Sequence, residues 1–142
     1  MTHGLSYNAS KAFSELFSGS ARATHGFKCA GWCVVPLVDV ADNPHFNFLN
    51  PAFVALVLAV LLEGLIALLW LGPPCSSFSM AVNHFWSHVM RSHQEPDGFT
   101  WLVGTELQKV EPGNALATIA CRLFKIATLA GAVQSWNSHH LH

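Results

Sequence analysis

Charged residues are scarce in this chain. They make up 11% of its 142 residues, against about a quarter in a typical soluble domain, while hydrophobic residues reach 51%. So few charges are typical of a piece of a larger globular unit, of a membrane protein, or of a sequence under weak selection for solubility. The length is that of one ordinary domain or part of one, and it is enough to bury a real core.

A basic excess is also missing, because the net charge is -1. Proteins that grip nucleic acid unaided usually carry a basic field that neutralises phosphates. Strong, self-sufficient nucleic-acid binding is therefore not indicated. A nucleic-acid partner would need contacts supplied from elsewhere.

A secretory signal is missing as well, since the first residues are polar and contain no apolar segment. Four cysteines stand at spacings that indicate no disulfide framework: Cys29, Cys33, Cys75 and Cys121. Reduced thiols in an intracellular compartment are therefore expected.

Metal ligands in a matching set are also lacking. His84 and His88 lie four positions apart on an expected helix with His93 nearby, but no acidic or cysteine ligand accompanies them. Cys29 and Cys33 have no second pair of ligands. We expect the histidines to form a solvated polar face and the chain to hold no metal.

One long apolar stretch, residues 53–71, raises the question of a membrane span. It is interrupted only by Glu63 and Gly64. A spanning helix would hold Glu63 near the middle of the bilayer at a cost of about 2.5 to 3.5 kcal/mol, and no basic cluster flanks either end. A small single-span membrane protein is one alternative.

The other reading of this stretch is a buried helix over 51–63, a turn at Gly64 and a buried strand over 65–71. Asn50 is a suitable N-cap and Pro51 a suitable first helical residue. Glycine is favoured just past a helix end. These helix start and stop signals favour a helix, a turn and a strand over a membrane span.

The amino-terminal part predicts a strand, a glycine loop and a short helix. The strand covers 12–17, and the helical turns cover 21–25 and end at Gly26. A β-branched run over 33–40 predicts a second strand, although Pro36 is unwelcome in a central strand. A short third strand is expected at 46–48.

The carboxyl-terminal part predicts two helices separated by a loop. Apolar spacing predicts one-sided helices over 77–89 and 114–130, and the irregular segment 92–112 predicts a surface loop. Strands alternating with helices predict an α/β fold with a parallel sheet and flanking helices. The expected domain covers 12–133, between a flexible leader over 1–11 and a polar tail over 134–142.

Two groups of residues are candidates for a functional site. The loop at Gly19, with Asp39 about 20 residues beyond it, has the layout of a nucleoside-cofactor site, although one glycine in a turn is often only a turn. Cys75 follows Pro74 at the expected start of a helix, a setting that favours a thiolate nucleophile. The alternative is a buried structural cysteine in a proline-rich turn.

These pieces resemble the cytosine-C5 DNA methyltransferases. Residues 15–20 read Glu-Leu-Phe-Ser-Gly-Ser and are similar to the first motif of that family. Residues 72–79 read Gly-Pro-Pro-Cys-Ser-Ser-Phe-Ser and are similar to its Pro-Cys motif. Residues 113–117, Gly-Asn-Ala-Leu-Ala, resemble a helix of divergent relatives that include mobile-element polyproteins.

The resemblance implies an incomplete Rossmann-like class I methyltransferase, a three-layer sandwich that uses S-adenosylmethionine. Cys75 would attack C6 of a cytosine flipped out of DNA, so that C5 can accept the methyl group. Asp39 would bind the ribose hydroxyls, Gly19 would approach the methionine portion, and Phe17 would line the adenosine pocket. Asn47 stands near the position of an adenine-contacting acid, and Pro74 completes the expected cofactor-binding set. Nuclear localisation is implied as well.

The sequence departs from the family in two ways. Ala21 stands where the family usually carries a second glycine, and a Glu-Asn-Val motif, an arginine motif and a target-recognition region are missing. The expected function is therefore a truncated methyltransferase-like domain of reduced or no activity, with a carboxyl-terminal portion or a larger polyprotein to complete it. A non-catalytic remnant or interaction module is the alternative.

Overall fold

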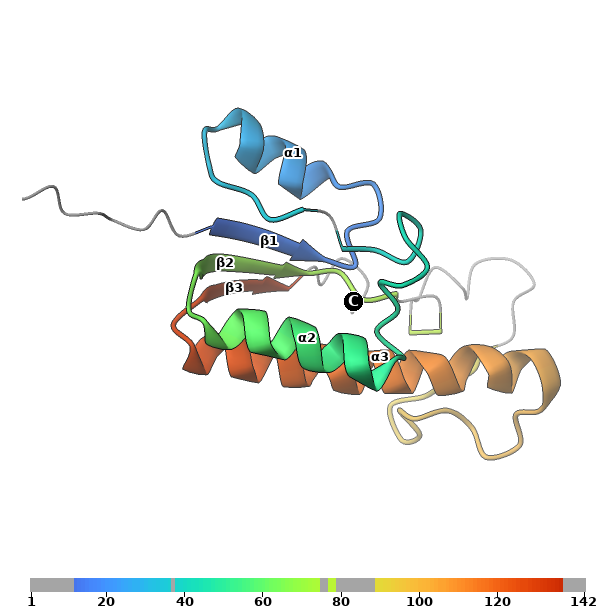
Figure 1. The fold of residues 1–142 in the computed structure, drawn as a ribbon. Coiled ribbons are helices and arrows are strands. Elements are labelled where there is room, and N and C mark those ends of the chain that lie inside the picture. The colour runs from blue at the N-terminus through green and yellow to red at the C-terminus, as the bar shows by residue number, and fades with distance from the viewer. Residues whose placement is uncertain (1–11, 37, 75–76, 79–88, 137–142) are drawn as a thin grey trace, which may run out of the picture.

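The protein is an α/β domain with a parallel sheet. The computed structural model describes residues 12–36, 38–74, 77–78 and 89–136. Its elements follow in the order β1 (Ala12–Leu16), α1 (Arg22–Cys29), α2 (Pro51–Leu62), β2 (Ile66–Leu71), α3 (Gly104–Leu129) and β3 (Val133–Trp136). Figure 1 shows α1 over one face of the sheet and α2 and α3 over the opposite face. The predicted α/β class with a parallel sheet and flanking helices is confirmed.

The three strands lie in the order β1, β2, β3, and both pairings are parallel. On the other edge of β1, Val34 and Val38 form isolated parallel bridges with Phe13 and Leu16. The predicted strand over 33–40 is therefore wrong in extent. Pro36 lies between the two bridging residues, and its nitrogen carries no hydrogen to continue a ladder.

The segment that could have been a membrane span is a helix, a turn and a strand, as predicted. The Asn50 side chain accepts a hydrogen bond from the Ala52 amide at 3.0 Å, and Pro51 opens the helix. Gly64 has φ +69°, which glycine adopts without steric cost. Within the part of the chain that the structure describes, no helix is both long enough and apolar enough to cross a bilayer.

Helix α3 begins well before the predicted residue 114, so the predicted loop over 92–112 is wrong beyond residue 103. Pro112 lies inside the helix, where it removes one backbone hydrogen bond. Burial offsets that loss, because Val110 is only 2% exposed and packs with Met90 and Leu102 in a second small core.

Three further boundaries differ from prediction. Strand β3 covers Val133–Trp136, so residues 134–136 of the predicted polar tail belong to the sheet, and the predicted strand at 46–48 is a turn region. Helix α1 continues through Gly26 to Cys29 instead of ending at the glycine. The leader over 1–11 and most of the predicted helix over 77–89 lie outside the described residues.

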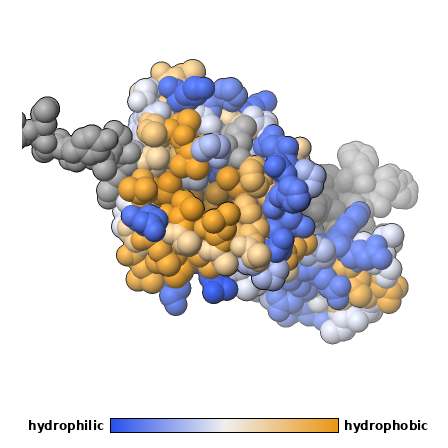
Figure 2. All heavy atoms as spheres, viewed as in Figure 1, coloured by the Kyte–Doolittle hydropathy of each residue, from blue (hydrophilic) through white to orange (hydrophobic). Residues whose placement is uncertain are grey.

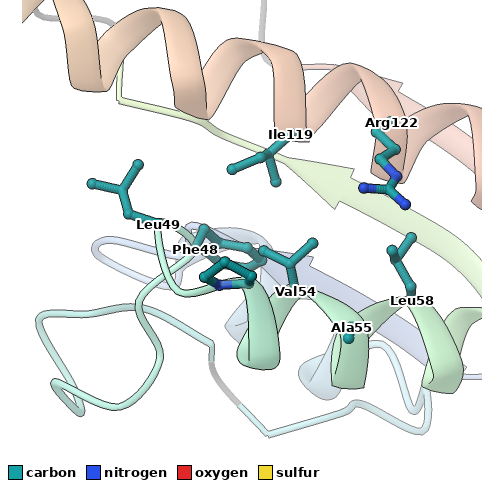
Figure 3. Close-up of a pocket in the computed structure, with 8 residues that line it drawn as sticks. Phe48, Leu49, Val54, Ala55, Leu58, Ile119 and Arg122 are labelled. Carbon is teal, nitrogen blue, oxygen red and sulfur yellow. The ribbon is translucent and has the colours of Figure 1, made fainter.

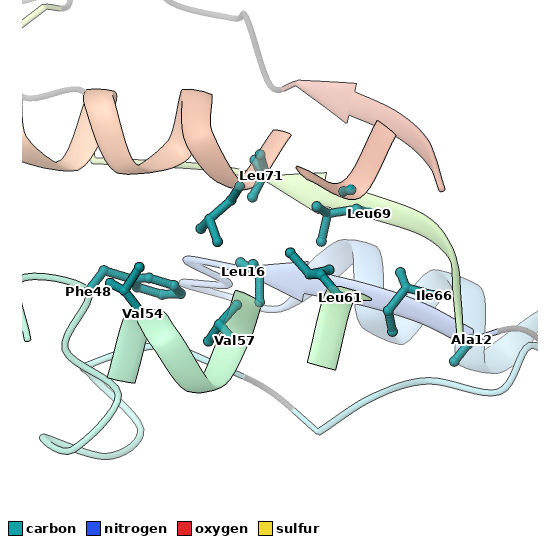
Figure 4. Close-up of a cluster of buried hydrophobic side chains, with 11 residues drawn as sticks. Ala12, Leu16, Phe48, Val54, Val57, Leu61, Ile66, Leu69 and Leu71 are labelled. Atoms are coloured by element: carbon teal, nitrogen blue, oxygen red, sulfur yellow. The ribbon is translucent and has the colours of Figure 1, made fainter. Parts of the chain in front are cut away.

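The main core lies between the sheet and the helices α2 and α3. Figure 4 shows leucine and isoleucine side chains of β1 and β2 facing leucine and valine side chains of α2. Leu69 and Leu71 of β2 and Leu123 of α3 are fully buried. The core thus fixes the ends of β1 and β2 relative to each other, and those ends carry the candidate site.

Candidate functional site

The loop after β1 turns sharply in the left-handed region of backbone conformation. Gly19 has φ 49°, and Phe17 and Ala21 reach φ 58° and 54° although they carry side chains. A non-glycine residue in this region costs about 1 to 2 kcal/mol. The backbone of Ala21 has a conformation that glycine favours. This is the position at which the resembled family usually has its second glycine.

Asp39 lies against the glycine loop, as its spacing predicted. Its carboxylate accepts hydrogen bonds from the Gly19 amide at 2.9 Å and from the Ala41 amide at 2.8 Å. Each carboxylate oxygen has two lone pairs and can accept a second hydrogen bond. Asp39 therefore fixes the loop and keeps acceptor capacity for a ligand hydroxyl.

The turn after β2 packs directly on the same loop. The Gly72 amide donates to the Leu16 carbonyl oxygen at 3.2 Å. A Cβ on Gly72 would stand 3.4 Å from the Phe17 carbonyl oxygen, which is van der Waals contact, so the two loops lie against each other. Pro74 follows and is exposed, whereas Cys75 lies outside the described residues.

The two loops meet where the chain changes direction across the sheet. After β1 it pairs at Val34 and Val38 on one edge of that strand, and then crosses to β2 on the other edge. In open parallel sheets, ligands bind in the crevice outside the carboxyl ends of strands at such a switch point. This topology places the glycine loop, Asp39 and the Gly72 turn together.

The Phe17 ring packs toward the interior. It lies 4.1 Å from the Phe48 ring, centroid to centroid, and Phe48 is 3% exposed. Phe48 also lines a pocket of about 390 Å³ between the start of α2 and Ile119 and Arg122 of α3 (Figure 3). Phe17 thus links the glycine loop to the wall of this pocket.

Asn47 lies beside that wall on an exposed loop. Its side-chain oxygen accepts a hydrogen bond from the Leu49 amide at 2.9 Å, so the residue stabilises a local turn next to Phe48. The structure brings together Phe17, Gly19, Asp39 and the Gly72 turn, and it places Asn47 and Pro74 at exposed positions around them.

Sequence reasoning missed Glu15. This residue of β1 is 7% exposed, and one carboxylate oxygen accepts from the Thr24 amide at 2.8 Å and from the Thr24 hydroxyl at 2.6 Å. Thr24 lies in the first turn of α1, whose N-cap residue, Ala21, supplies no side-chain acceptor. One signal was available in the sequence. Alanine stands at the expected helix start, where Ser, Thr, Asp or Asn usually caps the first turn, and a carboxylate lies in the strand just before the loop.

Ser18 is a second buried polar residue of the loop. It is 5% exposed, and its hydroxyl has no hydrogen-bond partner among the described residues.

No protein-family model, curated protein or solved structure matches this chain. The family resemblance therefore rests on the motif residues of the sequence.

No group of three potential metal ligands gathers among the described residues. Cys29, Cys33 and Cys121 are free and exposed. His84 and His88 lie outside the described residues.

Proposed function

We propose that this chain is a Rossmann-like domain of the cytosine-C5 methyltransferase type that binds S-adenosylmethionine. One observation carries the proposal: at the switch point of a parallel sheet, Asp39 accepts a hydrogen bond from Gly19 while the Gly72 turn packs on the same loop. A glycine loop beside an acid about 20 residues further on, at the end of the adjacent chain segment, is an arrangement that binds nucleoside cofactors.

The residues divide between cofactor and base. Asp39 would accept hydrogen bonds from the ribose hydroxyls, and the exposed Gly19 backbone would approach the methionine portion. Phe17 would supply an apolar wall for the adenosine. The cofactor contributes an electrophilic methyl group bound to sulfur.

Cys75 is the proposed nucleophile toward a DNA cytosine extruded from the duplex. Its thiolate would add to C6 and make C5 nucleophilic. C5 would take the methyl group as the methyl–sulfur bond breaks and the sulfur leaves as a thioether, and loss of the C5 proton to solvent would then expel the cysteine thiolate. The strand after α3 reads Val-Gln-Ser-Trp, so β3 carries no carboxylate in the place of a Glu-Asn-Val motif. We therefore expect cofactor binding to be retained and methyl transfer to be weak or absent.

Titration calorimetry with S-adenosylmethionine tests the cofactor site. Asp39→Asn replaces one of two backbone-bonded carboxylate oxygens with a donor, and we expect Kd to rise by about tenfold, equivalent to about 1.4 kcal/mol. Asp42→Asn is the matched control, because Asp42 is exposed and lies on the same loop. The absence of saturable binding by the wild-type protein would overturn the proposal.

DNA that contains 5-fluorocytosine tests the nucleophile. With S-adenosylmethionine present, an active site traps a covalent adduct because fluorine cannot leave C5 as a proton does. An adduct that disappears in Cys75→Ser would establish the nucleophile. Cofactor binding without any adduct would place the chain among non-catalytic relatives of the family.

An interaction module is a second candidate, favoured by helix α2. This helix is apolar on every side, but only one side is buried. Leu56 and Leu62 are therefore 60% and 64% exposed. An apolar pocket of about 230 Å³ lies beside this helix and is lined in part by Val35 and Val38. Sedimentation velocity over a range of concentrations tests this role, which requires association that Leu56→Lys abolishes.

A further inference from the structure

Arg91 joins segments that are far apart in the sequence. Its Nε donates to the Ser77 carbonyl oxygen at 3.0 Å, and Nη2 donates to the Ser77 hydroxyl at 2.9 Å and to the Val110 carbonyl oxygen at 3.1 Å. Nη1 donates to the Pro96 carbonyl oxygen at 2.6 Å and to the Asn114 side-chain oxygen at 2.5 Å. These bonds connect the chain after the Pro-Cys motif, the 91–98 loop and α3.

The guanidinium has no donor left for a ligand. Arginine carries five N–H donors, and all five are used in these contacts. The group also lies over the Phe78 ring, 3.7 Å from its centroid. Burial lowers the pKa of Arg91, an effect that the nearby Asp97 carboxylate opposes. Such a group holds protein segments together and does not bind an incoming phosphate.

Two residues of α3 are shaped for this contact. A Cβ on Gly113 would stand 2.6 Å from the Ser77 Oγ and 3.3 Å from Arg91 Nη2, so a side chain there would displace Ser77 or the guanidinium. The Asn114 side chain accepts from Arg91 and donates to the Asp97 carbonyl oxygen at 2.8 Å. In the motif 113–117, Gly113 therefore leaves room for Ser77 and Arg91, and Asn114 connects Arg91 to the Asp97 main chain.

We propose that Arg91, Gly113 and Asn114 form a clamp that fixes Ser77 and Phe78, and that Arg91 is a positioning residue for the Pro-Cys motif. Ser77 lies shortly after Cys75 in the sequence, and the clamp binds both its main chain and its hydroxyl. The catalytic consequence rests on the proposed function of Cys75, whereas the clamp itself rests on the contacts of described residues.

Alkylation of the cysteines in the folded chain tests the positioning role. Rates for each cysteine are measured by peptide mass spectrometry over a series of pH values in the wild type, Gly113→Ala and Arg91→Lys. Cys29, Cys33 and Cys121 are exposed and act as internal standards. Gly26→Ala is the matched glycine control, because no atom lies within 4 Å of its added Cβ.

We expect the alkylation rate of Cys75 at a given pH to change by at least about threefold in both clamp variants, because small displacements alter reactivity strongly. The three standards, and all cysteines in Gly26→Ala, should keep their wild-type rates. Unchanged Cys75 reactivity in both folded variants would overturn the positioning role. Cofactor titration of the same variants separates this outcome from failure of the cofactor site, which would appear already in the wild type.

A measurement on the wild-type chain covers the case in which both variants unfold. The Arg91 Nε–H group bonded to Ser77 should exchange with solvent at least about tenfold more slowly than that of the exposed Arg122, as hydrogen bonding and burial protect exchangeable protons. Equal exchange at Arg91 and Arg122 would show that no clamp forms.

Discussion

Glu15 and Thr24 show how a single side chain can replace a helix cap. Helix α1 begins after Ala21, which has no side-chain acceptor, yet the Thr24 amide in its first turn is bonded by the buried Glu15 carboxylate. A negative charge at this end also interacts favourably with the helix dipole. The first strand therefore anchors the helix that follows the glycine loop.

Glu15→Gln should lower the free energy of unfolding by about 1 to 2 kcal/mol, because hydrogen bonds to a charged acceptor are roughly twice as strong as neutral ones. Urea unfolding followed by circular dichroism measures the change. Glu111→Gln provides the control, since Glu111 is exposed on α3 and its substitution should alter stability by less than about 0.5 kcal/mol. Equal midpoints for both variants would contradict a capping role for Glu15.

At the residue scale, the sequence was most informative where the geometry is set by spacing. The contact between Asp39 and Gly19 agrees with their spacing in the sequence, because helix α1 and a short extended segment return the chain to the end of β1. The cofactor role of Asp39 stays a prediction. Glu15 was missed because its partner Thr24 lies nine residues further along the chain, and no local sequence pattern pairs a strand carboxylate with the first turn of the following helix. The Arg91 contacts were missed because they depend on how three distant segments pack.

Helix α2 is the element in which local signals and structure agree most closely. Asn50 caps its start, and Gly64, with φ +69°, ends the turn that leads into β2. These signals act within a few residues, so tertiary packing cannot override them easily.

Replacing Gly64 by alanine should destabilise the protein by about 1 kcal/mol, since a Cβ strains a left-handed backbone. The added carbon has room, with the nearest atom, the Ala130 carbonyl oxygen, at 3.7 Å, so strain and not a clash is responsible. Gly26→Ala lies inside α1 and should instead raise stability by about 0.5 to 1 kcal/mol. Thermal unfolding of the two variants distinguishes them, and a shift in the same direction for both would refute the argument.

The elements that were predicted poorly depend on partners distant in the sequence. Pro112 was read as part of a loop, but burial of Val110 holds the first turns of α3 in place. Residues 133–136 lack a strand-like apolar alternation, yet β2 supplies a parallel partner for each of them. Propensity decides neither case, because the stabilising contacts come from other parts of the chain.

At the scale of the whole molecule, one face is unusually apolar. Figure 2 shows hydrophobic residues gathered on the side that α2 occupies. The exposed large hydrophobic side chains of this helix and the residues after it include Leu56, Val60, Leu62 and Leu65. A patch of this kind promotes association in a chain with only 11% charged residues. We therefore expect the solubility of the chain to be limited by where the apolar residues lie as well as by their number.

The double variant Leu56→Lys/Leu62→Lys should be markedly more soluble than the wild type. Its stability should change by less than about 1 kcal/mol, because both side chains are already mostly exposed. Thr105→Lys/Gln108→Lys adds the same charge at exposed polar positions of α3 and controls for charge alone. Precipitation assays with ammonium sulfate measure the difference, and an equal gain in both double variants would show that the apolar patch is not responsible.

The parallel sheet also determines when this protein can fold during synthesis. Ala12 pairs with Ile66 and Leu68 pairs with Val133, so β1 must wait for β2 and β2 must wait for β3, which are made much later. Contacts of such long sequence separation form slowly, because a long loop must close before any pairing is gained. At about 5 to 20 residues per second, the ribosome releases α2 and β2 several seconds before β3 can join them. In that interval the apolar α2 is available to chaperones and to neighbouring nascent chains.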